Sequence, residues 1–138
     1  PLWRHLINYR CGTGHSVSFV GNVHEGPHAL NSRNTTRMRP GMVVTDEPGV
    51  YETDLVGIRI ENELVCVHKA DNQYGTFLGF EPIMFVPIAT SPIVPGVLTK
   101  DELDWLNNYH RQVFEKLAPR LNDEEREWLA KKCAAIGC

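Results

Sequence analysis

The first two thirds of the chain carry short apolar runs in which hydrophobic and polar residues alternate, as they do in β-strands. Gly, Pro and Asn residues separate these runs and mark turns between them. The runs predict three strands, at residues 19–23, 42–45 and 58–67. A further apolar run at residues 80–88 contains Pro82 and Pro87. Because proline cannot donate to a sheet, this run predicts an edge strand or a bulged one.

Charged residues break the alternation in the third run. Ile58 and Ile60 are apolar, whereas Arg59 and Glu61 are charged. Since successive side chains of a strand point to opposite faces, these charged groups must face something polar. The sequence therefore predicts that a functional site borders this strand.

The last third of the chain changes to a helical period. Two capping boxes, each with a Glu three residues after the capping side chain, occur at Thr99 with Glu102 and at Asn122 with Glu125. They predict one helix that ends before Pro119 and a second that runs towards the end of the chain. Strands first and helices last, with no regular β-α-β alternation, indicate an α+β fold.

Length and composition favour one globular domain. A chain of 138 residues, 42% of them hydrophobic, can bury a substantial core. We expect a single domain over residues 1–138, with a sheet-rich part at 1–97 and a helical tail at 98–138. The chain starts without methionine, and residues 1–7 look like the tail of an element. We therefore expect it to be part of a longer protein.

Charge and cysteine content exclude several classes of partner. The net charge is -3 and no block of Lys and Arg is present, which argues against nucleic acid or an anionic membrane. No stretch approaches the roughly 18 consecutive apolar residues of a membrane-spanning helix. The four cysteines form no C-x-x-C pair and no dense framework, which fits a reducing compartment. The sequence therefore predicts a soluble, cytoplasmic protein.

Three short motifs look catalytic but lack the context that catalysis requires. Residues 24–28 match the letters H-E-x-x-H of zinc proteases, but Gly26 and Pro27 prevent the necessary helix. Ser16 lies in a near-match to G-x-S-x-G, but an extended run follows it in place of a helix. Residues 12–14 read G-T-G without the third glycine of a phosphate loop. This segment instead indicates a close approach of the backbone to a neighbour.

Four residues near the predicted strands combine imidazole and carboxylate groups, namely His15, His24, Glu47 and Glu61. A site that mixes these groups suits Mn, Co, Zn or Fe. Each residue also has an ordinary alternative. His15 could bond the backbone of its loop, Glu47 could open a turn, and Glu61 could pair with Arg59 on a solvated face. The residues alone leave the choice between these readings open.

Four segments of the sequence resemble the signature blocks of the pita-bread metallopeptidases, specifically the Xaa-Pro aminopeptidases. The blocks read G-T-G-H at 12–15, V-H-E-G-P at 23–27, T-D-E-P-G-V-Y at 45–51 and G-I-R-I-E-N at 57–62. Their order and spacing fit the family, and the similarity continues through W-L-N-N-Y-H at 105–110. The resemblance implies the carboxyl-terminal part of a catalytic domain. Its fold would be a partial pita-bread fold, a mainly antiparallel curved sheet with carboxyl-terminal helices.

The resemblance assigns metal-binding roles to three residues. His15 and Glu47 would be ligands on the side of one ion, and Glu61 would bridge two ions. The implied cofactors are two divalent metal ions, with manganese expected first and cobalt or zinc as alternatives. The implied activity is hydrolysis of the amino-terminal Xaa-Pro bond by the intact parent protein.

The same resemblance gives other residues catalytic or substrate-binding roles. His24 would contact the substrate, shuttle a proton and support the tetrahedral intermediate. Arg59 would orient the site, and Tyr51 would lie close by. Glu47 would also act as the general base. The implied partner is a peptide with proline at its second position.

The glycine-rich segment departs from the family pattern. Cys11 stands where many relatives have histidine, and Ser16 and Ser18 stand in place of glycines. We expect Cys11 to be a small buried residue and the two serines to tighten the loop beside the proline pocket. The remaining histidines have no motif context and are expected to be surface or structural residues: His5, His28, His68 and His110.

The family takes two further aspartate ligands from strands that precede the His15 segment. Asp46 and Asp54 do not fall at those positions. With three of five ligands, we expect this chain alone to bind metal weakly or to be metal-free, with little or no peptidase activity. Exposed strand edges would favour association with a second copy, so we expect a homodimer.

Two alternatives to a peptidase stay open at this stage. Relatives that have lost the metals serve as peptide- or protein-binding modules on the same fold. A metal-free hydrolase of the creatinase type would keep the architecture without needing both glutamates. Retention of His15, Glu47 and Glu61 favours the peptidase.

Overall fold

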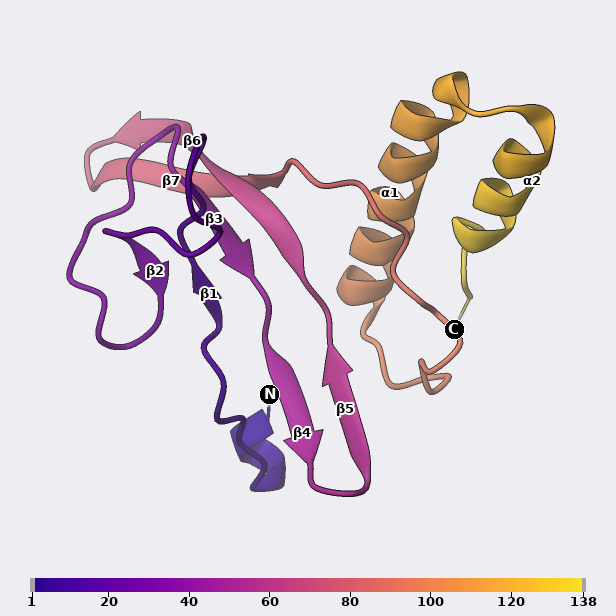
Figure 1. Cartoon of the computed structure of the whole chain (residues 1–138), viewed down its shortest axis with the longest axis horizontal. Coiled ribbons are helices and arrows are strands. Elements are labelled where there is room, and N and C mark those ends of the chain that lie inside the picture. The colour runs from indigo at the N-terminus through magenta and orange to yellow at the C-terminus, as the bar shows by residue number, and fades with distance from the viewer. Residues whose placement is uncertain (1, 138) are drawn as a thin grey trace. The chain divides into compact units, whose positions relative to one another are not determined.

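The computed structural model describes residues 2–137, so Pro1 and Cys138 lie outside the described part. The chain divides into two compact units, Pro1–Met84 and Phe85–Cys138. The first unit holds the strands, and the second holds the two α-helices (Figure 1). The predicted change from a sheet-rich to a helical part at residue 97 falls inside the second unit. That domain assignment stays a prediction.

The first unit begins with a 3-10 helix, η1 (Leu2–His5), and continues with short antiparallel sheets. Its largest sheet has the strand order β3-β6-β7. Two further pairs are β1 with β2 and β4 with β5. The bounds are β1 (Gly14–His15), β2 (Ala29–Leu30), β3 (Val43–Asp46), β4 (Gly49–Glu52), β5 (Val56–Arg59), β6 (Asn62–Asn72) and β7 (Gly75–Pro82).

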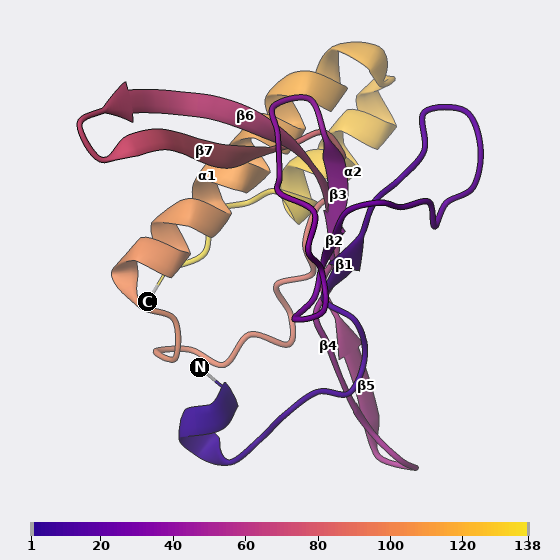
Figure 2. The same cartoon turned by 90° about the vertical axis from the view of Figure 1, so that its left-hand side faces the viewer.

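Strands β3 and β4 together run antiparallel to β5 and β6 as one long ribbon (Figure 1). Asp46 pairs with Asn62, and Gly49 pairs with Arg59. Two residues separate these pairs on each side of the ribbon, 47–48 on one and 60–61 on the other. The register is therefore continuous from the β3–β6 pair to the β4–β5 pair. The same register places Glu47 opposite Glu61. From the side, the β6–β7 hairpin turns away from the axis of this ribbon (Figure 2).

Three of the strand predictions need correction. Residues 19–23 form a loop, in which Ser18 N–H donates to Asn22 O and the Phe19 side chain is fully exposed. The run at 58–67 is split between β5 and β6 at residues 60–61. The run at 80–88 ends as a strand at Pro82, although β7 is an edge strand as predicted. Apolar side chains alone did not specify pairing at these positions.

The second unit contains α1 (Lys100–Leu117), a short 3-10 turn η2 (Ala118–Arg120) and α2 (Asp123–Lys132). Both predicted capping boxes are present, one at Thr99 and one at Asn122. The second helix ends earlier than predicted, at Lys132. The two helices lie side by side (Figure 1). They enclose a core formed by Tyr109, Val113 and Leu129, with partly buried residues around it: Phe85, Ile88, Phe114, Leu117, Leu121 and Cys133.

Three polar side chains of α1 bind the backbone of segments that have no regular structure. The Asn107 amide exchanges two hydrogen bonds of 3.0 Å with the main chain of Ile136. The Tyr109 hydroxyl donates to Val86 O at 2.9 Å and accepts from its N–H at 3.3 Å. His110 Nε2 accepts from Ile88 N–H at 3.1 Å. The W-L-N-N-Y-H segment therefore satisfies backbone groups that no sheet or helix pairs.

His110 predicts a loss of stability in weak acid. Its side chain is fully buried, and burial lowers the pKa of His110 below the ordinary 6.5. The folded chain therefore keeps this imidazole neutral at a pH where the unfolded chain protonates it. We expect the free energy of unfolding to fall as the pH drops below about 6.5, by at most ~1.4 kcal/mol per pH unit, and to level off below the folded-state pKa.

The measurement is urea unfolding of the wild type and of His110→Gln between pH 7.5 and pH 5. Other titrating groups contribute equally to both proteins, so the difference between the two curves isolates His110. Parallel curves for the two proteins would contradict this role.

Candidate metal centre

Glu47 is a buried acidic side chain of the first unit whose two carboxylate oxygens both have polar contacts. It follows β3 and is only 8% exposed. Its Oε1 atom accepts a hydrogen bond of 3.0 Å from the Thr45 hydroxyl, and Oε2 accepts one of 2.7 Å from Arg59. Its backbone N–H donates to Thr13 O at 2.6 Å. Both carboxylate oxygens are thus held in fixed directions.

His15, in β1, faces the same carboxylate. His15 Nε2 lies 3.1 Å from Glu47 Oε1, and His15 Nδ1 lies 3.0 Å from the carbonyl oxygen of Ser16. A carbonyl oxygen only accepts, so Nδ1 carries the proton of this bond. In the neutral imidazole, Nε2 is then an acceptor aimed at another acceptor. Such a pair needs a proton or a metal ion between its members.

The donor set fits a metal ion. Imidazole nitrogen and carboxylate oxygen bind divalent transition metals at about 2.0–2.2 Å. Two such ligands at adjacent positions around one ion would lie about 3.0–3.5 Å apart, given those bond lengths. The separation of 3.1 Å between His15 Nε2 and Glu47 Oε1 falls in this range. These two residues would therefore hold one ion from one side.

The strand register gives the backbone position of Glu61 relative to Glu47. It stands opposite Glu47 in the ribbon, and residues directly opposite in antiparallel strands have Cβ atoms about 4.5–5.5 Å apart on the same face. Glu61 is exposed. Within residues 2–137, no group of three or more His, Cys, Asp and Glu side chains is arranged to hold a metal ion. The structure thus brings His15 and Glu47 into contact, and the strand register places Glu61 opposite Glu47.

Arg59 and Tyr51 lie on the Glu47 face of the ribbon. The Arg59 guanidinium is 5.5 Å from the centre of the Tyr51 ring. A Cβ atom added at Gly49 or Gly57 would lie 2.7 or 2.9 Å from that ring, so these two glycines make room for it. Desolvation acts to lower the pKa of Arg59, but Tyr51, Cys11 and Glu47 outweigh it and raise that pKa. The guanidinium is therefore a permanent cation beside Glu47.

The imidazole ring of His24 lies against that of His15 in a tilted arrangement. The two ring centres are 3.9 Å apart with an angle of 37° between the planes. His24 is exposed and belongs to the loop after residue 16, which Ser16 secures by a hydrogen bond from its hydroxyl to Glu25 O. Residues 24–28 form no helix, in agreement with the rejection of the zinc-protease motif. His24 is accessible to a ligand that reaches His15.

Close backbone packing brings the histidine strand to Glu47. A Cβ atom at Gly14 would lie 1.8 Å from the carbonyl oxygen of Thr45. This contact confirms that the G-T-G segment approaches a neighbour.

Cys11 is half-buried and donates to Gly49 O at 3.2 Å, so it is less buried than expected.

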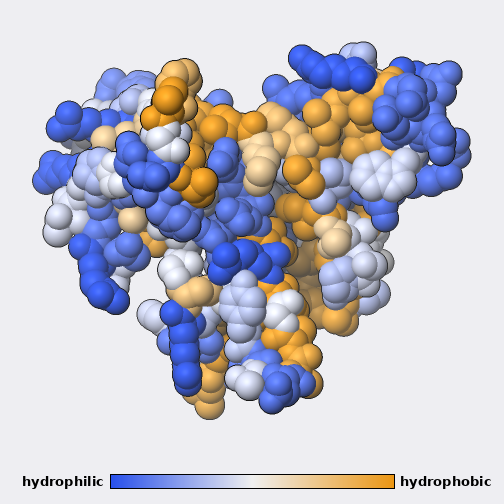
Figure 3. All heavy atoms as spheres, in the orientation of Figure 1, coloured by the Kyte–Doolittle hydropathy of each residue, from blue (hydrophilic) through white to orange (hydrophobic). Residues whose placement is uncertain are grey.

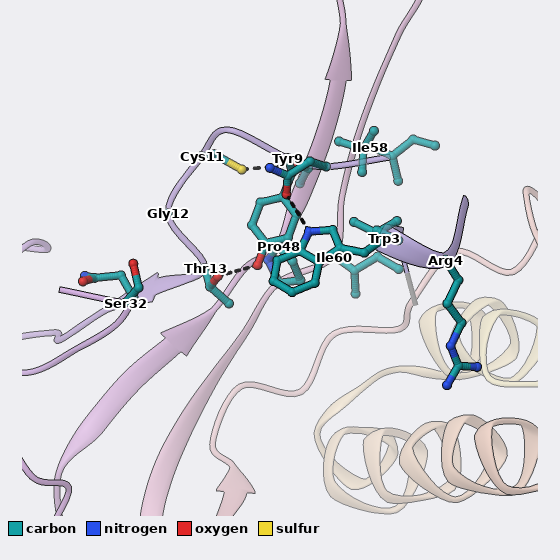
Figure 4. A pocket seen from close by; sticks show the side chains of 15 residues that line it. Trp3, Arg4, Tyr9, Cys11, Gly12, Thr13, Ser32, Pro48, Ile58 and Ile60 are labelled. Atoms are coloured by element: carbon teal, nitrogen blue, oxygen red, sulfur yellow. Dashed lines mark hydrogen bonds between the residues drawn. The ribbon is translucent and has the colours of Figure 1, made fainter. Parts of the chain in front are cut away.

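The opposite face of the ribbon is apolar. Pro48, Val50, Ile58 and Ile60 line a cavity of ≈ 1040 Å³ there, together with residues that include Trp3 (Figure 4). Hydrophobic atoms are exposed along this ribbon (Figure 3). Strand alternation accounts for the division, because these residues alternate with Glu47, Arg59 and Glu61.

The other histidines have the expected character. His28 is buried and its Nε2 donates to Val43 O at 2.7 Å, while His110 is the buried residue of α1 described above. His5 and His68 are exposed.

The residue that sequence reasoning missed is Thr45. Its position two residues before Glu47 on the same strand face was the available signal.

Comparisons with known proteins match almost the whole chain. Residues 1–68 match metallopeptidase family M24, and residues 76–136 match the C-terminal region of peptidase M24. Aminopeptidase P1 of Lotus japonicus is 41% identical over 99% of this chain, and Aminopeptidase P2 of Arabidopsis thaliana is 45% identical over 93%. A crystal structure of X-prolyl aminopeptidase from Caenorhabditis elegans, described as a cytosolic enzyme with a di-nuclear active site, is 38% identical over 98% of the chain with a TM-score of 0.87.

The chain spans about a fifth of the length of these relatives. The shares are 22% and 19% of the two plant proteins and 23% of the nematode chain. Among residues 2–137, no helix has the length and apolar character needed to cross a membrane.

Proposed function

Since the chain belongs to metallopeptidase family M24 and is similar to Xaa-Pro aminopeptidases, we propose that its full-length protein hydrolyses the amino-terminal Xaa-Pro peptide bond. The fold is the expected α+β partial pita-bread fold, with antiparallel sheets followed by two helices. The observation that carries the proposal is the contact of the buried Glu47 carboxylate with His15 on one side and Arg59 on the other.

His15, Glu47 and Glu61 would hold two divalent metal ions in the full-length protein. When bound, such ions activate a water molecule and polarise the scissile carbonyl. Manganese is proposed as the native metal because carboxylates outnumber imidazoles in this donor set, with cobalt and zinc as alternatives. The acceptor pair formed by His15 Nε2 and Glu47 Oε1 supports this assignment.

The remaining residues would act directly on the substrate. Glu47 is the proposed general base, since its Oε1 atom is fixed towards the face where His15 lies. His24 would donate to the oxygen of the tetrahedral intermediate, because its ring lies against that of His15 and is exposed. Arg59 holds Glu47 in place, and Tyr51 would border the peptide through its exposed ring.

The proposal also covers the chain taken by itself. It carries three of the five ligands that the family resemblance implies, so we propose that it binds metal weakly and has little activity alone. We further propose a cytoplasmic homodimer. The outer edge of β7 lacks a partner strand among the described residues and carries exposed Phe77 and Phe80, which supports association with a second copy.

The experiment compares two peptides that differ only in the second residue, Xaa-Pro-Xaa and Xaa-Ala-Xaa, with metal-free and manganese-loaded full-length protein. We expect cleavage of the proline peptide only, and only after loading. Binding of the proline peptide without cleavage would favour a silent peptide-binding module. Cleavage without any metal would favour the creatinase type of hydrolase.

A further inference from the structure

The Thr45 hydroxyl connects two candidate metal ligands, His15 in β1 and Glu47 directly after β3. Its Oγ1 atom accepts a hydrogen bond of 3.0 Å from the backbone N–H of His15 and donates one of 3.0 Å to Glu47 Oε1. Thr45 itself is 2% exposed. No water competes for these bonds at a residue so deeply buried, so both bonds are retained in the folded chain.

Donor and acceptor counting fixes the direction of both bonds. The backbone N–H of His15 can only donate, so the Thr45 hydroxyl oxygen accepts this bond through one of its lone pairs. The ionised carboxylate of Glu47 can only accept, so the single hydroxyl proton points to Oε1. The hydroxyl oxygen lies 3.5 Å from the carbonyl oxygen of His15, which makes that alternative acceptor much weaker.

The oxygen that Thr45 holds is the one that faces the imidazole. Glu47 Oε1 lies 3.1 Å from His15 Nε2, whereas Oε2 is bound by Arg59. The terminal torsion of a glutamate side chain is broad, so a carboxylate without both contacts would rotate. Thr45 and Arg59 together remove this freedom, one for each oxygen.

We propose that Thr45 is a positioning residue of the metal centre, which sets the orientation of Glu47 and the distance between Glu47 and His15. The inference rests on the proposed function and deepens it. Thr45 does not touch the substrate or a metal ion; it acts through the carboxylate and through the backbone of β1. Loss of such a supporting hydrogen bond typically weakens metal binding by about 10–100-fold.

The test compares Thr45→Val, Thr45→Ser and Thr36→Val in the full-length protein. Valine keeps the shape of threonine and removes the hydroxyl, whereas serine keeps the hydroxyl. Thr36 is a half-buried threonine away from Glu47 in the sequence, whose hydroxyl donates to Pro27 O, so Thr36→Val controls for the chemical change alone.

We expect Thr45→Val to raise the dissociation constant for Mn²⁺ by about 10–100-fold and to lower kcat with little change in KM. Thr45→Ser and Thr36→Val should stay within about threefold of the wild type, because both keep the hydrogen bonds of Thr45. If Thr45→Val does not fold, Thr45→Cys replaces it, with a weaker donor and an intermediate loss of affinity. If Thr45→Val binds Mn²⁺ with wild-type affinity, the proposal is overturned, and the same holds for Thr45→Cys where that variant is used in its place. An equal loss of Mn²⁺ affinity in Thr45→Ser would overturn it too. A wild-type protein that neither binds Mn²⁺ nor cleaves Xaa-Pro peptides would instead refute the proposed function.

Discussion

Glu47→Gln is expected to lower kcat/KM of the full-length protein for an Xaa-Pro peptide by about 10²–10⁴-fold, the range for loss of a general base. Glutamine is nearly isosteric, but its amide cannot take a proton and its NH₂ group would face a donor. The carboxylate also pairs with Arg59 and lies beside His15, so the metal affinity should fall as well. The measurement is steady-state hydrolysis at saturating Mn²⁺, with the bound metal determined in parallel.

Glu81→Gln supplies the matched control for this change. Glu81 is exposed on β7 and forms an ion pair with Lys69 on the neighbouring strand. Exposed pairs contribute little, so the control should retain wild-type activity. A Glu47→Gln protein that cleaves the peptide within threefold of the wild-type rate would rule out Glu47 as the base.

Gly14→Ala is expected to destabilise the chain by about 3 kcal/mol or more, because the added methyl group would lie 1.8 Å from the carbonyl oxygen of Thr45. The backbone fixes the position of the Cβ atom, and the oxygen belongs to the backbone, so no side-chain rotation relieves the clash. The strand that carries His15 would have to move away from β3. Urea unfolding of the 138-residue chain measures the effect, and the separation should also weaken metal binding in the full-length protein.

Gly12→Ala is the control two residues away. A Cβ atom there would meet no atom within 4 Å. Alanine in place of such a glycine leaves stability unchanged or raises it by up to about 1 kcal/mol. Equal stability of the two alanine variants would show that β1 does not depend on the close contact with Thr45.

The helical part of the chain was predictable because its signals are local. Each capping box involves residues three positions apart, and both boxes occur as predicted at Thr99 and Asn122. The strands were harder, since a strand exists only where a distant partner pairs with it. Residues 19–23 have strand composition without a partner, and they form an exposed loop.

The candidate site was also predictable only in part, because some of its residues depend on long-range contacts. Family resemblance supplied His15, Glu47 and Glu61, and the long ribbon register places the two glutamates opposite each other. The roles of Thr45 and Gly14 depend on β1 packing against β3, a contact between segments about thirty residues apart. No periodicity or motif within either segment specifies that contact.

The central claim is that the side chains of His15, Glu47 and Glu61 bind metal ions together. Anomalous diffraction at the manganese absorption edge, from crystals of the full-length protein soaked in Mn²⁺, tests it most directly. The account predicts two peaks, one of them within about 2.0–2.3 Å of both His15 Nε2 and a Glu47 oxygen, with Glu61 in contact with both. Peaks elsewhere, or none near these three residues in crystals that contain manganese, would contradict it.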